Sequence, residues 1–64
     1  MPVINIKMSS TTDEKKKELI QKLTETASEV TNISKGAFTV FIEEYPHQSI
    51  GVGGEVLSDI MAKQ

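Results

Sequence analysis

The residue with the most distinctive chemistry in this sequence is Pro2, which directly follows Met1. Methionine is commonly removed when the next residue is small, and its removal here would give the proline a free secondary amine. An ordinary α-amino group has a pKa of about 7.7 to 8.0, and an apolar pocket lowers that pKa because it disfavours the cation. Such an amine is suited to general base catalysis at cellular pH. The simpler interpretation is that Pro2 only opens an edge strand.

Other residues of catalytic type lack the partners that their chemistry needs. His47 is the only histidine and the chain has no cysteine, so neither a nucleophilic triad nor a structural zinc site is indicated. Glu43 and Glu44 are neighbours in a predicted strand, where adjacent side chains point to opposite faces. We therefore expect His47 to be a solvated loop residue, the two glutamates to act separately, and no metal to be bound.

The glycine segment at residues 51–54 and the lysine run at residues 15–17 both have plain structural interpretations. A dinucleotide-binding loop opens a long helix, and a Walker loop ends in Lys-Ser or Lys-Thr, whereas Glu55 follows the glycines here. The three lysines fall on the polar side of a predicted helix, among acidic neighbours, which is typical of a solvated face. The sequence therefore predicts neither a nucleotide nor any other cofactor.

The charge composition argues against two classes of partner. The net charge is -2, and all seven cationic residues are lysine, so binding to nucleic acid or to an anionic membrane surface is not expected. No apolar run is long enough to span a membrane, and the N-terminus lacks the layout of a signal peptide. We expect a soluble cytoplasmic protein.

Hydrophobic periodicity predicts a strand, a helix and a second strand, in that order. Residues 3–8 alternate apolar and polar side chains, and residues 37–43 are rich in β-branched and aromatic side chains. Between them, Thr11 and Glu14 match a capping box, so a helix is expected to begin near Asp13. The apolar stripe of this helix consists of Leu19, Ile20, Leu23, Ala27 and Val30.

These elements predict one α+β domain over residues 1–64, built as a βαβ unit with a parallel two-stranded sheet. The glycines of residues 51–54 indicate a turn or short β-ribbon, and residues 56–61 indicate a short helical turn or a packed tail. Residues 40–42 are apolar on both faces, yet one helix covers only one face of such a sheet. Because 64 residues without a disulfide are also marginally stable alone, we predict an oligomer, at minimum a dimer.

Several motifs occur in the order and spacing of one known family. They are Pro2 before the first strand, Thr12-Asp13-Glu14-Lys15-Lys16 with Leu19-Ile20 at the helix start, Val40-Phe41-Ile42-Glu43-Glu44 in the second strand, and Ile50-Gly51-Val52-Gly53-Gly54-Glu55 near the end. With these motifs, nearly the whole chain resembles the 4-oxalocrotonate tautomerase family.

The resemblance implies a function and an assembly. It implies that Pro2 is the general base of a keto–enol isomerase that acts, without a cofactor, on a small enol or keto acid. Suitable acids are a 2-hydroxydienoate or an enolpyruvate. It also implies protomers that pair and assemble into a homohexamer, a trimer of dimers, with active sites bounded by neighbouring subunits.

The sequence departs from the family at the residues that hold the substrate. Family members that act on diacids carry two arginines, and the matching positions here hold Thr11, with Ser10 or Thr12 as alternatives, and Thr39. Ile50 stands where the family has an aromatic wall residue. The residues that are candidates to replace the arginines from an adjacent subunit are Lys7, Lys35 and His47.

Two other functions fit the same sequence. A small non-catalytic interaction protein would keep the oligomeric scaffold while lacking the arginines. A third interpretation keeps Pro2 but uses it in hydration or dehalogenation chemistry.

Overall fold

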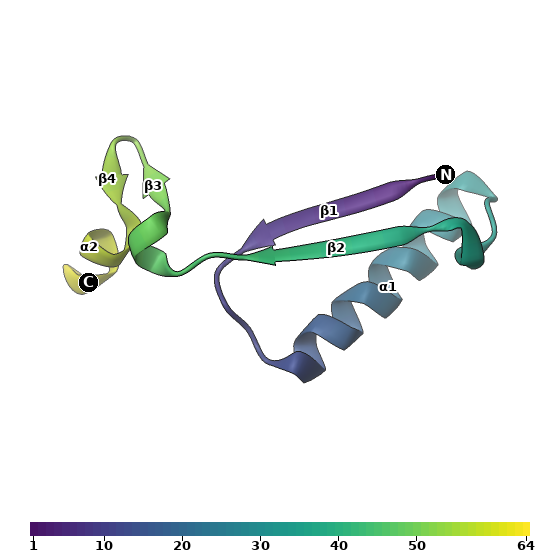
Figure 1. The fold of residues 1–64 in the computed structure, drawn as a ribbon, viewed down its shortest axis with the longest axis horizontal. Helices are drawn as coiled ribbons and strands as arrows, with labels where there is room; N and C mark the ends of the chain where they lie inside the picture. The colour runs from purple at the N-terminus through teal and green to yellow at the C-terminus, as the bar shows by residue number, and fades with distance from the viewer.

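The computed structural model describes residues 1–64 and has the predicted order of strand, helix and strand (Figure 1). The strands β1 (Val3–Met8) and β2 (Thr39–Glu44) pair in parallel, with Val3 opposite Thr39 and Met8 opposite Glu44. The helix α1 (Asp13–Thr31) connects the two strands and lies on one side of them. The prediction of an α+β fold with a parallel two-stranded sheet is therefore confirmed.

The start of α1 agrees with the prediction, but its cap does not. The N-cap is Thr12, not Thr11, because Thr12 Oγ1 accepts a hydrogen bond from the Lys15 backbone N–H at 3.2 Å. The N–H of Thr11 donates to a residue outside the helix, as described below. At the other end, Asn32 takes the left-handed conformation, with φ of 59°, and its N–H donates to the Ser28 carbonyl.

The chain after β2 forms a small separate unit. The strands β3 (Gly51–Val52) and β4 (Glu55–Val56) pair antiparallel, so residues 51–54 belong to a short β-ribbon, one of the two predicted forms. The helix α2 (Leu57–Ala62) is the helical one of the two forms predicted for residues 56–61. Single 3-10 turns occupy Lys35–Ala37 and His47–Ser49. The sequence predicted a strand that begins at residue 37. Because residues 35–37 form the first of these turns, β2 begins at Thr39 instead. In Figure 1 the small unit lies beyond the carboxyl ends of β1 and β2, away from the N-terminus.

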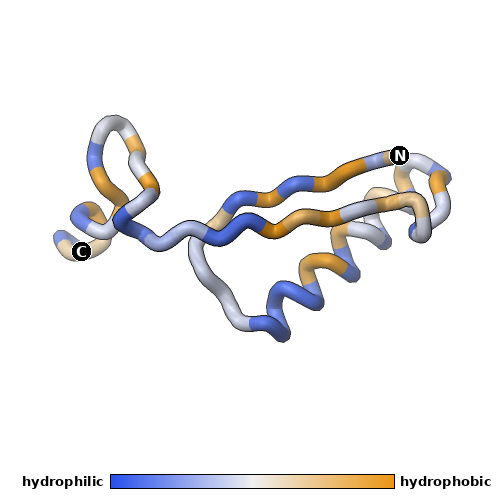
Figure 2. The backbone as a smooth tube through the Cα atoms, in the orientation of Figure 1, coloured by the Kyte–Doolittle hydropathy of each residue, from blue (hydrophilic) through white to orange (hydrophobic).

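The sheet has one covered face and one open face. On β1, Ile4, Ile6 and Met8 are half-buried, whereas the alternate residues are exposed. Phe41 of β2 is 53% exposed and Val3 of β1 is 58% exposed. Figure 2 shows the apolar residues of the two strands lying side by side. The open face therefore presents Phe41 and Val3, which nothing in the single chain covers, beside the exposed polar residues Asn5 and Lys7.

The helix α1 also has apolar residues that the single chain leaves uncovered. Leu19, Leu23 and Ala27 of the predicted stripe are half-buried, but Ile20 and Val30 are exposed in the single chain. The prediction that Ile20 and Val30 face a core is therefore wrong for the single chain. Val30 lies in the last turn of α1, which is at the end of the sheet where β1 begins (Figure 1).

No residue of the single chain is buried, and the chain is extended for its size. Its accessible surface is 4940 Å², whereas a compact monomer of this mass exposes about 4,000 Å². Its radius of gyration is 15.1 Å, against about 11 Å for a compact chain of this length. The physical conclusion is that one chain lacks a core of its own. Neither helix is long and apolar enough to cross a membrane.

Candidate active site

Pro2 is held at the point where the two strands begin. Its carbonyl accepts a hydrogen bond from the Thr39 backbone N–H at 3.1 Å, which extends the parallel ladder by one residue. Pro2 is half-buried, whereas Met1 is 98% exposed. The structure includes Met1, so the Pro2 nitrogen is part of a peptide bond here. Since Met1 packs against almost nothing, its removal would leave the strand pairing unchanged.

The predicted site residues fall into two groups at opposite ends of the sheet. Thr39 lies beside Pro2 at the start of the strands. Thr11 follows the end of β1, and Ile50 follows the end of β2. The six residues of β1 span about 20 Å. Within one chain, Pro2 therefore cannot share a substrate with Thr11 or Ile50.

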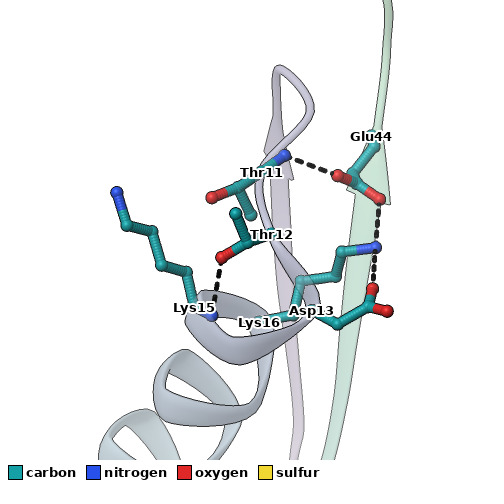
Figure 3. A network of polar contacts seen from close by, with 6 residues as sticks. All are labelled: Thr11, Thr12, Asp13, Lys15, Lys16 and Glu44. Atoms are coloured by element: carbon teal, nitrogen blue, oxygen red, sulfur yellow. Dashed lines mark hydrogen bonds and ion pairs between the residues drawn. The ribbon is translucent and has the colours of Figure 1, made fainter.

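Thr11 is fixed by Glu44, the last residue of β2. The Thr11 backbone N–H donates to Glu44 Oε2 at 2.8 Å, and Glu44 Oε1 lies 2.7 Å from Lys16 Nζ. Lys16 also lies 3.4 Å from Asp13 Oδ1. Figure 3 shows these four residues, hereafter the Glu44 network, joining the end of β2 to the start of α1. The network ties the connector between β1 and α1 to the end of β2.

The charges of the Glu44 network stabilise each other. Two hydrogen bonds lower the pKa of Glu44 below its ordinary value. The larger effect comes from Lys16 and the smaller one from the Thr11 N–H. The same contact with Glu44 raises the pKa of Lys16 and outweighs the opposing effect of partial desolvation. Both groups are therefore ionised near neutral pH. The sequence analysis did not predict this network. Its only signal was that the connector after β1 must pass the end of β2, the parallel partner strand.

Thr11 lines a surface hollow of about 560 Å³ at the start of α1. The lining residues are Met8, Thr11, Lys15, Glu18, Leu19 and Lys22. In Figure 3, Thr11 and Lys15 lie on the same side of the helix start, and Glu44 lies on the other. We call this hollow the Thr11 hollow.

Ile50 lines a second, smaller hollow of about 310 Å³, together with Lys7, Met8, Tyr45 and Ser49. Next to it, the Tyr45 hydroxyl donates to Glu43 Oε2 at 2.7 Å. This hydrogen bond is the main cause that lowers the pKa of Glu43, with smaller contributions from Asn5 and Lys7, and it raises the pKa of Tyr45.

The prediction that Glu43 and Glu44 act separately is confirmed, because they bind different partners: Glu43 binds Tyr45, and Glu44 binds Thr11 and Lys16.

The other candidates of the sequence lie apart from Pro2. His47 is half-buried beside Ser10, Tyr45 and Pro46. Lys35 lines a hollow on the α1 side of the molecule, with Glu25 among its neighbours. No group of three or more His, Cys, Asp or Glu side chains is arranged to hold a metal ion.

Comparison with known proteins gives a consistent result. The family model described as tautomerase enzyme matches residues 2–60, so the match begins at Pro2. A 2-hydroxymuconate tautomerase of Bacillus subtilis is 41% identical over 61 residues, which cover 94% of this chain and 98% of the relative.

Solved structures share the fold of this chain. DmpI from Helicobacter pylori superposes with a TM-score of 0.85 at 32% identity, over 91% of this chain and 98% of the other. DmpI from Archaeoglobus fulgidus superposes with a TM-score of 0.85 at 33% identity, over 91% of this chain and 100% of the other. With a matching fold, a family match that begins at Pro2 and a relative 41% identical over nearly its whole length, the chain belongs to the tautomerase family of enzymes.

Proposed function

We propose that this protein, with Met1 removed, catalyses keto–enol tautomerisation of a 2-hydroxydienoate or an enolpyruvate-type acid, with the Pro2 amine as the general base. The observation that carries the proposal is the placement of Pro2. It is bound to Thr39 through its backbone, half-buried, and preceded only by an exposed methionine. The similarity to a 2-hydroxymuconate tautomerase supports the substrate class.

The proposed reaction moves one proton and leaves the oxidation state of the substrate unchanged. The Pro2 nitrogen accepts the proton of the enol oxygen, and the electron pair of that O–H bond forms the carbonyl. The carbon–carbon double bonds shift along the chain, and a distal carbon takes the proton back from the protonated amine. Because the amine is regenerated, the balance requires no oxidant, reductant or metal.

Thr39 is the only predicted site residue on the same chain that lies next to Pro2. Its side chain is a neutral hydroxyl, which can donate one hydrogen bond to a substrate oxygen. It supplies no charge. Any cation that stabilises the developing charge on the substrate must therefore come from another element or another copy of the chain.

We further propose that the site is completed by neighbouring copies in a homo-oligomer built from dimers, most simply a homohexamer. Two observations support this assembly. The chain exposes more surface than a compact monomer of its mass, and Phe41 and Val3 are exposed on the face of the sheet that no element of the chain covers. Because Thr11 and Ile50 lie at the end of the sheet opposite Pro2, they could reach the substrate of a Pro2 amine only from another copy of the chain.

Two measurements test the proposed function. Mass spectrometry of the purified protein should give the mass of residues 2–64. The trimmed protein should then convert 2-hydroxymuconate to its keto isomer, followed by ultraviolet absorbance, and Pro2→Ala should lower kcat/KM by about a thousandfold or more, in line with loss of a positioned base. A trimmed oligomer that converts no enol acid would favour the non-catalytic interaction protein.

A further inference from the structure

The open face of the sheet carries two opposite charges that the single chain does not join in an ion pair. Lys7 of β1 stands opposite Glu43 of β2 in the register of the parallel sheet. Residues paired across neighbouring strands point to the same face, and exposed Lys7 alternates with half-buried Ile6 and Met8. Both charges therefore lie on the open face. Lys7 forms no ion pair within the chain, so its charge is available to a group outside it.

The two charges lie at one end of this face. Its other residues, nearer the start of the strands, are uncharged: Val3 and Asn5 of β1, and Thr39 and Phe41 of β2. Val3 and Phe41 are the exposed apolar residues among them. The open face therefore has an apolar half toward the N-terminus and a charged end toward the carboxyl ends of the strands.

Glu43 is held in place by Tyr45. The Tyr45 hydroxyl, on a side chain that is itself 39% exposed, donates to Glu43 Oε2 at 2.7 Å. This bond is the main cause that lowers the pKa of Glu43, so the carboxylate is ionised near neutral pH. A carboxylate can accept about four hydrogen bonds, and the bond from Tyr45 leaves most of that capacity open. Glu43 therefore presents a fixed negative charge beside the positive charge of Lys7.

The position of the charges limits how a second copy can cover the face. Stacked sheets keep their strand directions within about 30° of each other. With the strands of the two copies pointing in opposite directions, the charges of one copy would meet Val3 and Thr39 of the other and would lose water without gaining a partner. With the strands pointing the same way, a two-fold axis along the strands places Lys7 of each copy over Glu43 of the other. Charge complementarity favours the second arrangement.

Such a pair selects a partner more than it tightens binding. An ion pair at an interface roughly offsets the cost of its own desolvation, whereas two like charges placed against each other weaken association strongly. A chain of the same fold with a charge of the wrong sign at either position would therefore be excluded. A second copy of this chain would fit.

We propose that Lys7 and Glu43 select a second copy of this chain as the partner on the open face, with Lys7 of each copy against Glu43 of the other. This inference rests on the homo-oligomer proposed above, and it adds which copies can pair and in which orientation. Because like ends of the two sheets then lie together, this contact does not bring Thr11 or Ile50 of one copy to Pro2 of the other. A further copy must do so through a different surface, which requires an assembly larger than a dimer.

The test exchanges the two charges. In the double variant Lys7→Glu/Glu43→Lys, opposite charges still meet between two copies of the variant, but like charges meet wherever a variant copy faces a wild-type copy. The variant should therefore assemble as the wild type does. Isotopically labelled wild type and the variant are unfolded together, refolded as a mixture, and counted by native mass spectrometry. Assemblies that contain a single copy of the other kind should be at least roughly tenfold rarer than random mixing gives.

The matched control is Lys17→Glu/Glu29→Lys, which exchanges the same two charges at exposed positions of α1. This variant should mix randomly with the wild type. Glu43→Gln removes one charge without creating a repulsion, so it should enter wild-type assemblies nearly as often as random mixing gives. These controls separate the sign of the charges on the open face from net charge and from surface charge in general.

Random mixing of the double variant with the wild type would overturn the inference, because Lys7 and Glu43 would then pair only within one chain. If the double variant does not assemble, the single variants Lys7→Glu and Glu43→Lys decide the question. Refolded together, they should form mixed assemblies that neither forms alone, and a mixture that stays unassembled would contradict the pairing.

The mixing experiment does not depend on the Pro2 amine, so a failure of the proposed reaction cannot be mistaken for a failure of this inference. A wild type that stays monomeric would overturn the proposed oligomer and the pairing with it.

Discussion

The backbone N–H of Thr11 donates to Glu44 Oε2 at 2.8 Å, a contact between residues 33 positions apart in the sequence. It joins the connector after β1 to the end of β2. Because Lys16 Nζ lies 2.7 Å from the other carboxylate oxygen, one side chain fixes both the connector and the first turn of α1. Glu44 therefore helps to position Thr11 and the first turn of α1, although it lies at the opposite end of the sheet from Pro2.

Replacing Glu44 should weaken this arrangement in a pH-dependent way. The folded-state pKa of Glu44 is lowered, so its contribution to stability is fully present above the pKa of an unfolded glutamate, about 4.3, and is lost as pH falls through the lowered folded value. Glu44→Gln should therefore have a lower thermal midpoint than wild type at pH 7. The difference should shrink as the pH falls below about 4.

The measurement is thermal unfolding followed by circular dichroism at one protein concentration, since assembly makes the midpoint concentration-dependent. Glu43→Gln is the matched control, because Glu43 also has a lowered pKa but is bound to Tyr45 rather than to the connector. Only Glu44→Gln should also raise KM for a diacid. Identical KM values for the two variants would show that Glu44 does not position the connector.

The open face of the sheet should be an interface between copies. Phe41 is 53% exposed on that face, and Phe41→Glu would place a charge where the account predicts an apolar contact. We expect association to weaken by about a hundredfold or more, and activity per chain to fall with it because the site is shared. Analytical ultracentrifugation measures the change.

Gln21→Glu, on the exposed side of α1, adds the same charge elsewhere and should leave assembly intact. If Phe41→Glu assembled and reacted like wild type, the open face would not be the interface.

The turn between β3 and β4 should require glycine. Gly54 has a φ of 87°, a conformation that L side chains rarely adopt. Gly54→Ala should cost roughly 1 to 2 kcal/mol. Gly36→Ala is the control, because Gly36 does not have a positive φ and the nearest atom to an added Cβ is Ser34 Oγ at 3.8 Å. Denaturant unfolding at fixed protein concentration should separate the two variants, and equal midpoints would contradict the expected strain.

Much of the fold could be predicted because it depends on local patterns. The alternation in residues 3–8 gives β1, the acidic first turn after Thr12 gives the start of α1, and the glycines give the β3–β4 ribbon. The parallel pairing follows from the length of the crossover helix. The N-cap was placed at Thr11 instead of Thr12, because both are threonines and only the backbone geometry distinguishes them.

The site was less predictable, because its contacts are not local. The bond between Thr11 and Glu44 depends on the register of β1 against β2, which residue types alone do not specify. The lysine run at residues 15–17 appeared uniform in sequence, yet Lys16 is ion-paired and Lys15 lines a hollow. Only the three-dimensional arrangement assigns these neighbouring lysines different roles.

The most direct test of the central claim is a comparison of two synthetic chains, one comprising residues 1–64 and the other residues 2–64, folded and assembled in the same way. The two differ only in whether the Pro2 nitrogen is an amide or a free amine, and Met1 is too exposed to affect the fold. We predict that the chain of residues 2–64 isomerises 2-hydroxymuconate and that the chain of residues 1–64 does not. Equal kcat/KM values for the two chains would contradict the assignment of the Pro2 amine as the base.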